Sequence, residues 1–164
     1  MDYTFRMTYE LITTWSDYQN AIDRVLERAG QRLWISDPDL VRLDLQQPAR
    51  LARLRQLLQG SRSDGLRIVL RDARHLRDRS PRLTELLRQY SHCMSVVETS
   101  PDLARLRDCM LLADEEHALI RFDQEQARSK LITDDRDQAA AYFNRFSALW
   151  QEGGTPVSGT TLGL

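Results

Sequence analysis

The sequence has 164 residues, of which 41% are hydrophobic and 29% charged, and its formal net charge is −1. This length favours one domain with its own hydrophobic core. No apolar run reaches the roughly 18 residues that a membrane-spanning helix requires, so the composition excludes a transmembrane protein.

The N-terminus and the two cysteines indicate the compartment. Asp2, Arg6 and Glu10 interrupt the N-terminal segment, where a signal peptide needs an apolar core. Cys93 and Cys109 lie within apolar runs, which favours reduced, packed thiols. We therefore expect a cytoplasmic protein without membrane association.

Helix and strand signals alternate through the first half of the chain. Gly30 and Gly60 stop two helical patterns, while Pro48 and Pro81 suit the first positions of the second and third helices. In chain order we predict a helix over 17–29, a strand over 32–36, a helix over 48–60, a strand over 66–71, a helix over 80–90 and a strand over 93–98. This βαβαβ order predicts parallel strands with helices on the sheet faces.

The second half changes to an antiparallel pattern. Segments 108–114 and 117–122 are separated only by Glu115 and Glu116, which predicts a hairpin that pairs residue 114 with 117 and 109 with 122. A strand over 129–134 and a helix over 135–152 follow. The predicted fold is therefore α/β, with a mixed, mainly parallel sheet of about six strands flanked by helices. We expect one domain over 1–152 and an extended or disordered tail over 153–164.

Charge is unevenly distributed along the chain. Residues 50–88 contain eleven arginines and four acidic residues, a net charge of +7, whereas residues 98–137 have a net charge of −5. Such segments can pair within the fold or between two copies of it, or they can form two solvated faces that partly neutralise each other.

The order of the elements, the segment RDCMLLAD (107–114) and the closing FNRFSALW (143–150) resemble the phospholipase D superfamily domain over residues 17–152. That family carries the catalytic signature H-x-K-x-x-x-x-D at the start of the hairpin. Here Arg107 stands at the histidine position, Cys109 at the lysine position and Asp114 at the aspartate position. Arg121 and Phe122 replace the Gly-Ser that follows in the family, and Gln124 lies near its asparagine.

These replacements remove the chemistry that the family uses. Its histidine forms a covalent bond to phosphorus and its lysine stabilises the phosphate charge. Arginine has no free lone pair for such an attack, and cysteine at the second position carries no positive charge. The family also builds one site from two motifs, and this sequence contains a single degenerate one. The resemblance therefore implies a non-catalytic, pseudoenzyme-like bacterial domain with a binding, regulatory or oligomerisation role.

An enzyme with a rebuilt site in the motif region, of phosphodiesterase or transferase type, is the alternative. Cys109 is its candidate nucleophile, but the predicted hairpin places His117 several residues away along the strands, out of hydrogen-bond reach. We predict no metal site, because His75 and His92 have no partners at ligand spacing, and no cofactor, because no glycine-rich phosphate loop is present.

Arginines provide the main candidate binding site. The segment RDARHLRDR (71–79) follows a predicted strand at the carboxyl edge of the sheet, where open α/β folds place their ligands. The predicted phosphate- or anion-binding residues are Arg71, Arg74, Arg77, Arg79 and Arg105. They suit a phosphate-bearing ligand or nucleic acid. The alternative is a solvated surface that Asp72 and Asp78 partly neutralise.

The expected protein partner is a second copy of the chain, because relatives with one motif assemble their site from two copies. The apolar tail with Val157 and Leu162 is a candidate contact for such a homodimer. Degenerate domains of this kind also accompany acetyltransferases in bacterial chains, so the resemblance implies an acetyltransferase as another candidate partner.

Overall fold

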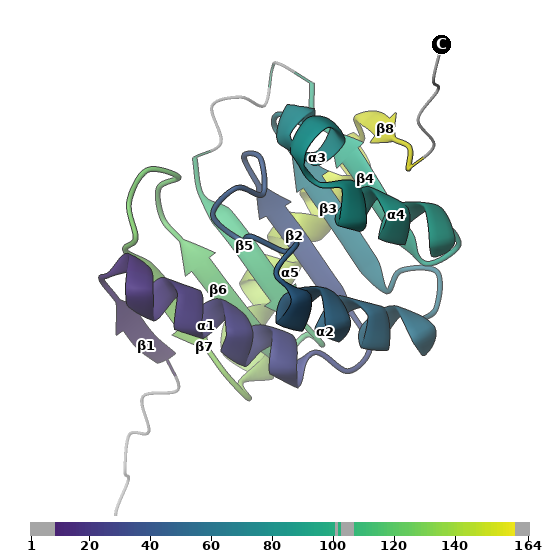
Figure 1. Cartoon of the computed structure of the whole chain (residues 1–164). Coiled ribbons are helices and arrows are strands. Elements are labelled where there is room, and N and C mark those ends of the chain that lie inside the picture. The colour runs from purple at the N-terminus through teal and green to yellow at the C-terminus, as the bar shows by residue number, and fades with distance from the viewer. Residues whose placement is uncertain (1–8, 101, 103–106, 160–164) are drawn as a thin grey trace, which may run out of the picture.

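The computed structural model describes residues 9–100, 102 and 107–159, which form one eight-stranded sheet with helices on both faces (Figure 1). In chain order the elements are β1 (Tyr9–Ile12), α1 (Trp15–Arg28), β2 (Leu33–Asp37), α2 (Pro48–Gln59), β3 (Leu66–Leu70), α3 (Arg74–Arg79), α4 (Pro81–Gln89), β4 (Met94–Glu98), β5 (Cys109–Ala113), β6 (His117–Arg121), β7 (Ser129–Ile132), α5 (Arg136–Glu152) and β8 (Thr155–Val157).

The strand order is β1-β7-β6-β5-β2-β3-β4-β8. Only the pairs β2–β3 and β3–β4 are parallel, and the other five pairs are antiparallel. The predicted mixed α/β fold is confirmed, but the sheet is mostly antiparallel rather than mainly parallel. The difference arises because parallel pairing is confined to β2, β3 and β4, whose connections contain helices α2, α3 and α4. The strands β5, β6 and β7 follow one another antiparallel, β5 pairs antiparallel with β2, and β1 and β8 add antiparallel to the two edges.

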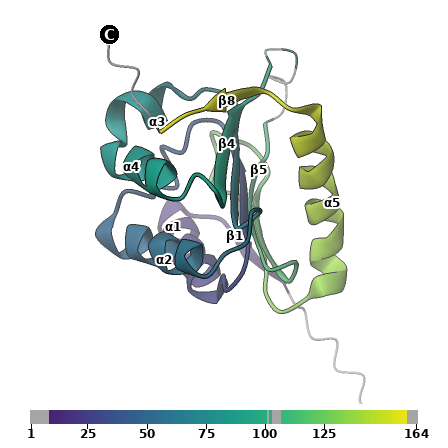
Figure 2. The same ribbon diagram turned by 90° about the vertical axis from the view of Figure 1, so that its right-hand side faces the viewer.

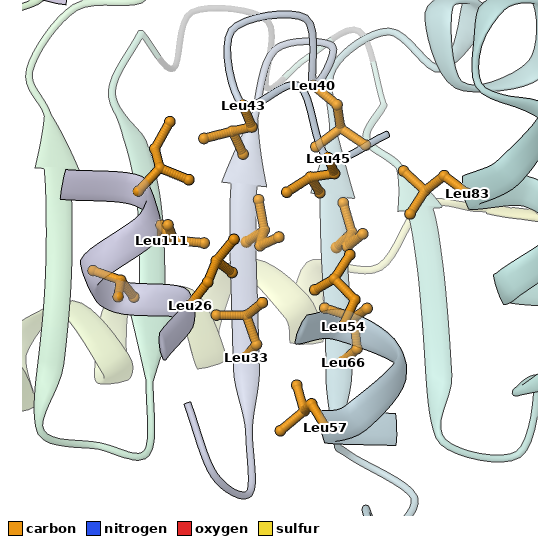
Figure 3. Close-up of a cluster of buried hydrophobic side chains, with 14 of the residues drawn as sticks. Leu26, Leu33, Leu40, Leu43, Leu45, Leu54, Leu57, Leu66, Leu83 and Leu111 are labelled. Atoms are coloured by element: carbon orange, nitrogen blue, oxygen red, sulfur yellow. The ribbon is translucent and has the colours of Figure 1, made fainter. Parts of the chain in front are cut away.

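The helices divide unevenly between the two faces. Figure 2 shows α5 alone on one side of the sheet and α1 to α4 on the other. The face below α1 to α4 holds a leucine-rich core, part of which is drawn in Figure 3. On the opposite face Trp34 stacks on Phe146 of α5, with 5.2 Å between ring centroids.

Helix starts follow capping rules. The Thr14 hydroxyl accepts a hydrogen bond from the Asp17 amide at 3.1 Å, so α1 begins two residues before the predicted start and Thr14 is its cap. Pro48 and Pro81 occupy the first turns of α2 and α4, as predicted. Gly153, with φ of 77°, ends α5 at the predicted position.

Three features differ from the sequence predictions. Residues 74–79 form the short helix α3 rather than a loop. The edge strands β1 and β8 were not predicted, and β8 places residues 155–157 of the expected tail in the sheet. A Cβ on Gly154 would lie 2.3 Å from the Glu98 carbonyl oxygen, so only glycine permits this close approach.

The β5–β6 hairpin also differs in register. Ala113 pairs with His117 and Cys109 with Arg121, so the turn contains three residues rather than two. Asp114 and Glu115 adopt positive φ values of 54° and 64° in this turn. No described helix is long and apolar enough to cross a membrane.

Candidate functional site

The positions that match the degenerate motif lie along the β5–β6 hairpin in the middle of the sheet. Strand β5 begins at the edge where β2 and β6 end (Figure 1), so Cys109, Asp37 and Arg121 come from three neighbouring strands at one edge. Arg107 precedes β5 at this edge, and Asp114 follows β5 at the opposite edge.

Arg107 is held by carboxylates. Its Nε donates to Asp123 Oδ2 at 2.8 Å and its Nη2 to Asp123 Oδ1 at 3.2 Å, and Glu125 Oε2 lies 3.8 Å away. The hydrogen bond from Arg107 lowers the pKa of Asp123 to about 2. Both partners are therefore charged near neutral pH, and Arg107 offers no basic nitrogen for attack on phosphorus.

Cys109 is buried at the start of β5. Burial, followed by the nearby charge of Asp37, raises the pKa of its thiol to about 12. A thiol with this pKa is a poor nucleophile, since the thiolate is the reactive form. His117 lies at the other end of the hairpin, opposite Ala113, about 13 Å from Cys109 at the usual rise per strand residue.

Beside Cys109 the sheet edge holds a fully buried ion pair. Arg121 and Asp37 have side chains that are 0% and 1% exposed, and Arg121 Nη2 lies 3.2 Å from Asp37 Oδ1. The Arg121 guanidinium also lies 5.4 Å from the ring centre of Trp15 and 5.1 Å from that of Tyr18, both on α1. Arg121 therefore fills, with a large charged side chain, the position at which the family signature has glycine.

Asp37 is supported by the backbone as well as by Arg121. Its Oδ2 accepts hydrogen bonds from the amides of Leu40 at 2.7 Å and Asp39 at 3.2 Å. Burial raises the pKa of Asp37, and the Arg121 charge and these amides oppose that shift. Arg121 Nη1 donates to the Gln124 carbonyl, whereas its Nε has no hydrogen-bond partner among the described residues.

Asp114 has a structural role at the far end of the hairpin. Its carboxylate accepts hydrogen bonds from the backbone amides of Gly30, Gln31 and Arg32 at 2.7, 2.8 and 2.9 Å. These bonds tie the α1–β2 connection to the hairpin turn. Asp114 is therefore not brought together with Arg107 and Cys109.

The described arginines of the predicted binding site lie on and just before α3. Arg71 turns toward the hairpin, where its Nη2 donates to the Asp108 carbonyl and its Nη1 lies 3.4 Å from Gln124 Oε1. Arg74 forms an exposed pair with Asp72, whose pKa it lowers to about 2. Arg71 and Arg74 therefore have different polar partners, the first at the hairpin and the second beside the start of α3.

The remaining predicted arginines differ in their setting. Arg77 and Arg79 are exposed on α3 and form no ion pair with any described residue. Arg105 lies outside the described residues.

One group of metal-ligand residue types occurs in the described part of the chain. Ligand atoms of Glu116, His117 and Asp134 lie within 4.8 Å of one another. However, His117 Nδ1 accepts the Asp134 amide at 3.0 Å, and the two carboxylates pair with Arg136 and Arg28. These atoms already have protein partners, so the geometry gives no reason to assign a metal here.

Sequence reasoning missed the charged group at this edge. It placed Arg121 at a family glycine but did not predict its burial, and it ended the predicted strand at residue 36, before Asp37. The sequence signals were a charged residue at the end of each of two apolar strands, LWISD and HALIR. Buried charges need partners, so two such residues of opposite charge, at the ends of the strands on either side of β5, favour an ion pair.

The fold is shared with proteins of known structure. TrmBL2, described as an archaeal chromatin protein with a novel mode of DNA binding, superimposes with a TM-score of 0.66 and 11% identity over 93% of this chain. This chain spans 55% of TrmBL2. Nuc from Salmonella typhimurium, a phospholipase D family member, has a TM-score of 0.59 and 10% identity over 92% of this chain and 97% of its own. NucT from Helicobacter pylori gives 0.59 and 10%, covering 90% and 98%.

The chain thus has a phospholipase D-like fold, as the sequence resemblance implied. Residues 14–158 match the family described as Domain of unknown function (DUF7931), and the chain belongs to this family. No curated protein matches the sequence.

Proposed function

We propose that this chain is a non-catalytic phospholipase D-like domain that acts as a binding or regulatory module. The observation that carries the proposal is the state of the two motif positions. Arg107 is paired with Asp123 and Glu125, and Cys109 is buried with its pKa raised to about 12. Neither supplies a nucleophile for phosphorus, and Cys109 supplies no charge for a phosphate oxygen.

The buried Arg121–Asp37 pair supports the same proposal. A site for a phosphodiester needs space beside its nucleophile, whereas here a guanidinium occupies the family's glycine position and packs on two aromatic rings. Its charge is matched by Asp37 within the protein. The relatives' motif needs an accessible surface at this edge of the sheet, and here a buried structural ion pair occupies that position.

The alternative, an enzyme rebuilt around Cys109, requires a thiolate and a nearby base. The raised pKa of the Cys109 thiol opposes the first requirement. The position of His117 at the opposite end of the hairpin opposes the second. The geometry therefore favours the binding module over the rebuilt enzyme.

Hydrolysis of bis(p-nitrophenyl) phosphate across acidic to alkaline pH tests the proposal. We expect the rate to equal that of buffer and to be the same for the wild type, Arg107→Ala and Cys109→Ala. A rate above background that either substitution abolishes would refute the non-catalytic assignment, because contaminating enzymes would not respond to these changes.

A phosphate-bearing ligand remains our proposed binding partner for the predicted arginines. Exposed Arg77 and Arg79 support this, since neither forms an ion pair with a described residue. The DNA binding stated for TrmBL2 makes nucleic acid one such ligand. Fluorescence anisotropy with labelled duplex DNA tests it: Arg77→Gln/Arg79→Gln should weaken binding and reduce its salt dependence. Binding that is unchanged by this pair of substitutions would exclude α3 as the contact.

We also propose that the chain forms a homodimer through the edge that carries the motif. Phe122, which directly follows β6 there, is 45% exposed although it is a large apolar side chain. Of the tail residues predicted to contact a second copy, Val157 is buried against its own sheet in β8, and Leu162 lies outside the described residues. Light scattering should give a dimer that Phe122→Ser dissociates, and a monomer in the wild type would refute this proposal.

A further inference from the structure

The charge of residues 98–137, the acidic segment, is largely neutralised by other groups of the same chain. Its carboxylates pair with arginines from several elements or cap backbone amides. These contacts are Asp108–Arg145, Glu115–Arg32, Glu115–Arg136, Glu116–Arg136, Asp123–Arg107 and Asp134–Arg28, together with the three amides bound by Asp114. This segment therefore has little charge left with which to neutralise the basic segment of a second copy.

The charge of residues 50–88, the basic segment, is not neutralised by ion pairs in the same way. Six of its arginines are exposed and form no ion pair with any described residue: Arg53, Arg55, Arg62, Arg77, Arg79 and Arg82. The nearby carboxylates of Asp72 and Glu85 are already bound by Arg74 and Arg88. The unmatched surface charge of α2, α3 and α4 is therefore positive, and a complementary partner must bring negative charge from another molecule.

A groove lies between α2 and α4 within this positive surface. Both helices cover the same face of the sheet (Figure 1), and the groove between them has a volume of about 530 Å³. Pro48, Leu51, Ala52 and Pro81 give it an apolar lining. Three charged side chains complete the lining, namely Arg55, Arg82 and Glu85.

We propose that this groove docks an acidic amphipathic segment of a partner protein, with its apolar side chains on the α2–α4 floor and its carboxylates on Arg55 and Arg82. Two features of the groove select this occupant. The apolar floor suits aliphatic anchors spaced as on one face of a helix. The two unpaired arginines select acidic residues beside those anchors.

The same features argue against a nucleic acid as the occupant. The groove lining contains no aromatic side chain on which a base could stack. Exposed Pro48, Ala52 and Pro81 offer no hydrogen-bonding side chain to a phosphate or a base edge. A phosphate backbone would use the arginines and leave the apolar floor unfilled.

The probe is a synthetic peptide of about 14 residues, roughly four helical turns, with leucines on one face and glutamates on the other. Two matched peptides replace its glutamates by glutamine or its leucines by serine, and a labelled DNA duplex is the competing probe. Binding to the full chain is followed by fluorescence anisotropy and by amide chemical shifts of Ala52 and Arg82. The groove variant is Arg55→Gln/Arg82→Gln, and Arg62→Gln is the control, since Arg62 is exposed on the same segment but does not line the groove.

We expect the wild type and Arg62→Gln to bind the acidic leucine peptide equally, and the groove variant to bind it at least about tenfold more weakly. Either altered peptide should lose a similar factor. Absence of any shift at about 1 mM peptide would overturn the proposal, as would equal weakening by Arg62→Gln. Tighter binding of DNA than of peptide, lost in the groove variant, would assign the groove to nucleic acid instead. The test reads binding alone, so its failure leaves the non-catalytic proposal standing.

Discussion

Replacing Arg121 by leucine tests how much the buried ion pair contributes to the fold. Both partners are essentially inaccessible, with side-chain exposures of 0% and 1%. Removing one member of such a pair leaves an uncompensated buried charge and typically costs about 3–5 kcal/mol. Asp37 retains its hydrogen bonds from the Leu40 and Asp39 amides, which places the expected loss near the lower limit, at about 3 kcal/mol.

Thermal and urea denaturation measure this loss. For a domain of this size, about 3 kcal/mol corresponds to a decrease in Tm of roughly 6–12 °C. Arg24→Leu is the matched control, because the Arg24–Glu10 pair also involves α1 but its side chains are 42% and 58% exposed. We expect the control to cost no more than about 1 kcal/mol. The double variant Arg121→Leu/Asp37→Asn should cost less than the sum of its two single changes, because no carboxylate charge remains unpaired.

The loss of stability in Arg121→Leu should depend on pH, and the pKa of Asp37 gives the direction of this dependence. Burial raises the pKa of Asp37 above its ordinary 3.8, and loss of Arg121 raises it further. An acidic group whose pKa is raised in the folded state stabilises the fold at pH values below its unfolded-state pKa. That contribution is lost as the pH rises through its folded-state pKa. The deficit of Arg121→Leu should therefore be smaller near pH 4 than near pH 8. A deficit below about 1 kcal/mol that does not change with pH would refute a charged, buried pair.

Four further predictions concern the thiols, the β8 edge and the hairpin turn. Neither Cys93 nor Cys109 should react with Ellman's reagent at pH 8 in the folded protein, because burial raises both pKa values; rapid reaction of Cys109 before unfolding would contradict its assignment as inert. The protonated Cys109 thiol should stabilise the fold at pH values below its ordinary pKa of 9.0, and this contribution should decline as the pH rises toward about 12. Cys109→Ala should remove this decline from the alkaline unfolding curve. Gly154→Ala should detach β8, since its Cβ would lie 2.3 Å from the Glu98 carbonyl oxygen, and unchanged hydrogen exchange in β4 would contradict this. Asp114→Ala should cost about 1–2 kcal/mol in urea denaturation, because three backbone amides lose their acceptor while those of Gly30 and Gln31 are exposed to water. A cost below about 0.5 kcal/mol would show that water replaces the carboxylate fully.

Several helix boundaries could be predicted from local signals. Pro48 and Pro81 mark helix starts, and Gly153 marks a helix end. The hairpin was predicted from two apolar runs too close together for a crossover, but its register was shifted. Register depends on Asp114, whose positive φ and three hydrogen bonds to a distant loop become visible only in the tertiary structure.

The edge strands and the buried charges could not be read in the same way. Strand β8 has three residues and contains Pro156, so its pairing depends on β4 rather than on its own propensity. Arg50 and Arg121 are buried although arginine is usually a surface residue, because Asp23 and Asp37 reach them from other elements. The candidate site was thus predicted as a loss of catalytic groups, while the ion pair that occupies the edge required the structure.

Intact-protein mass spectrometry after incubation with an activated phosphodiester tests the central claim most directly. Family catalysis would place a covalent phosphoryl group on a side chain at the motif edge. With Arg107 paired to Asp123 and Cys109 buried, we expect the mass of the protein to remain unchanged over a wide range of pH. A phosphoryl adduct in the wild type that disappears in Arg107→Ala or Cys109→Ala would show that the edge still reacts with phosphorus, and would contradict the assignment of a non-catalytic domain.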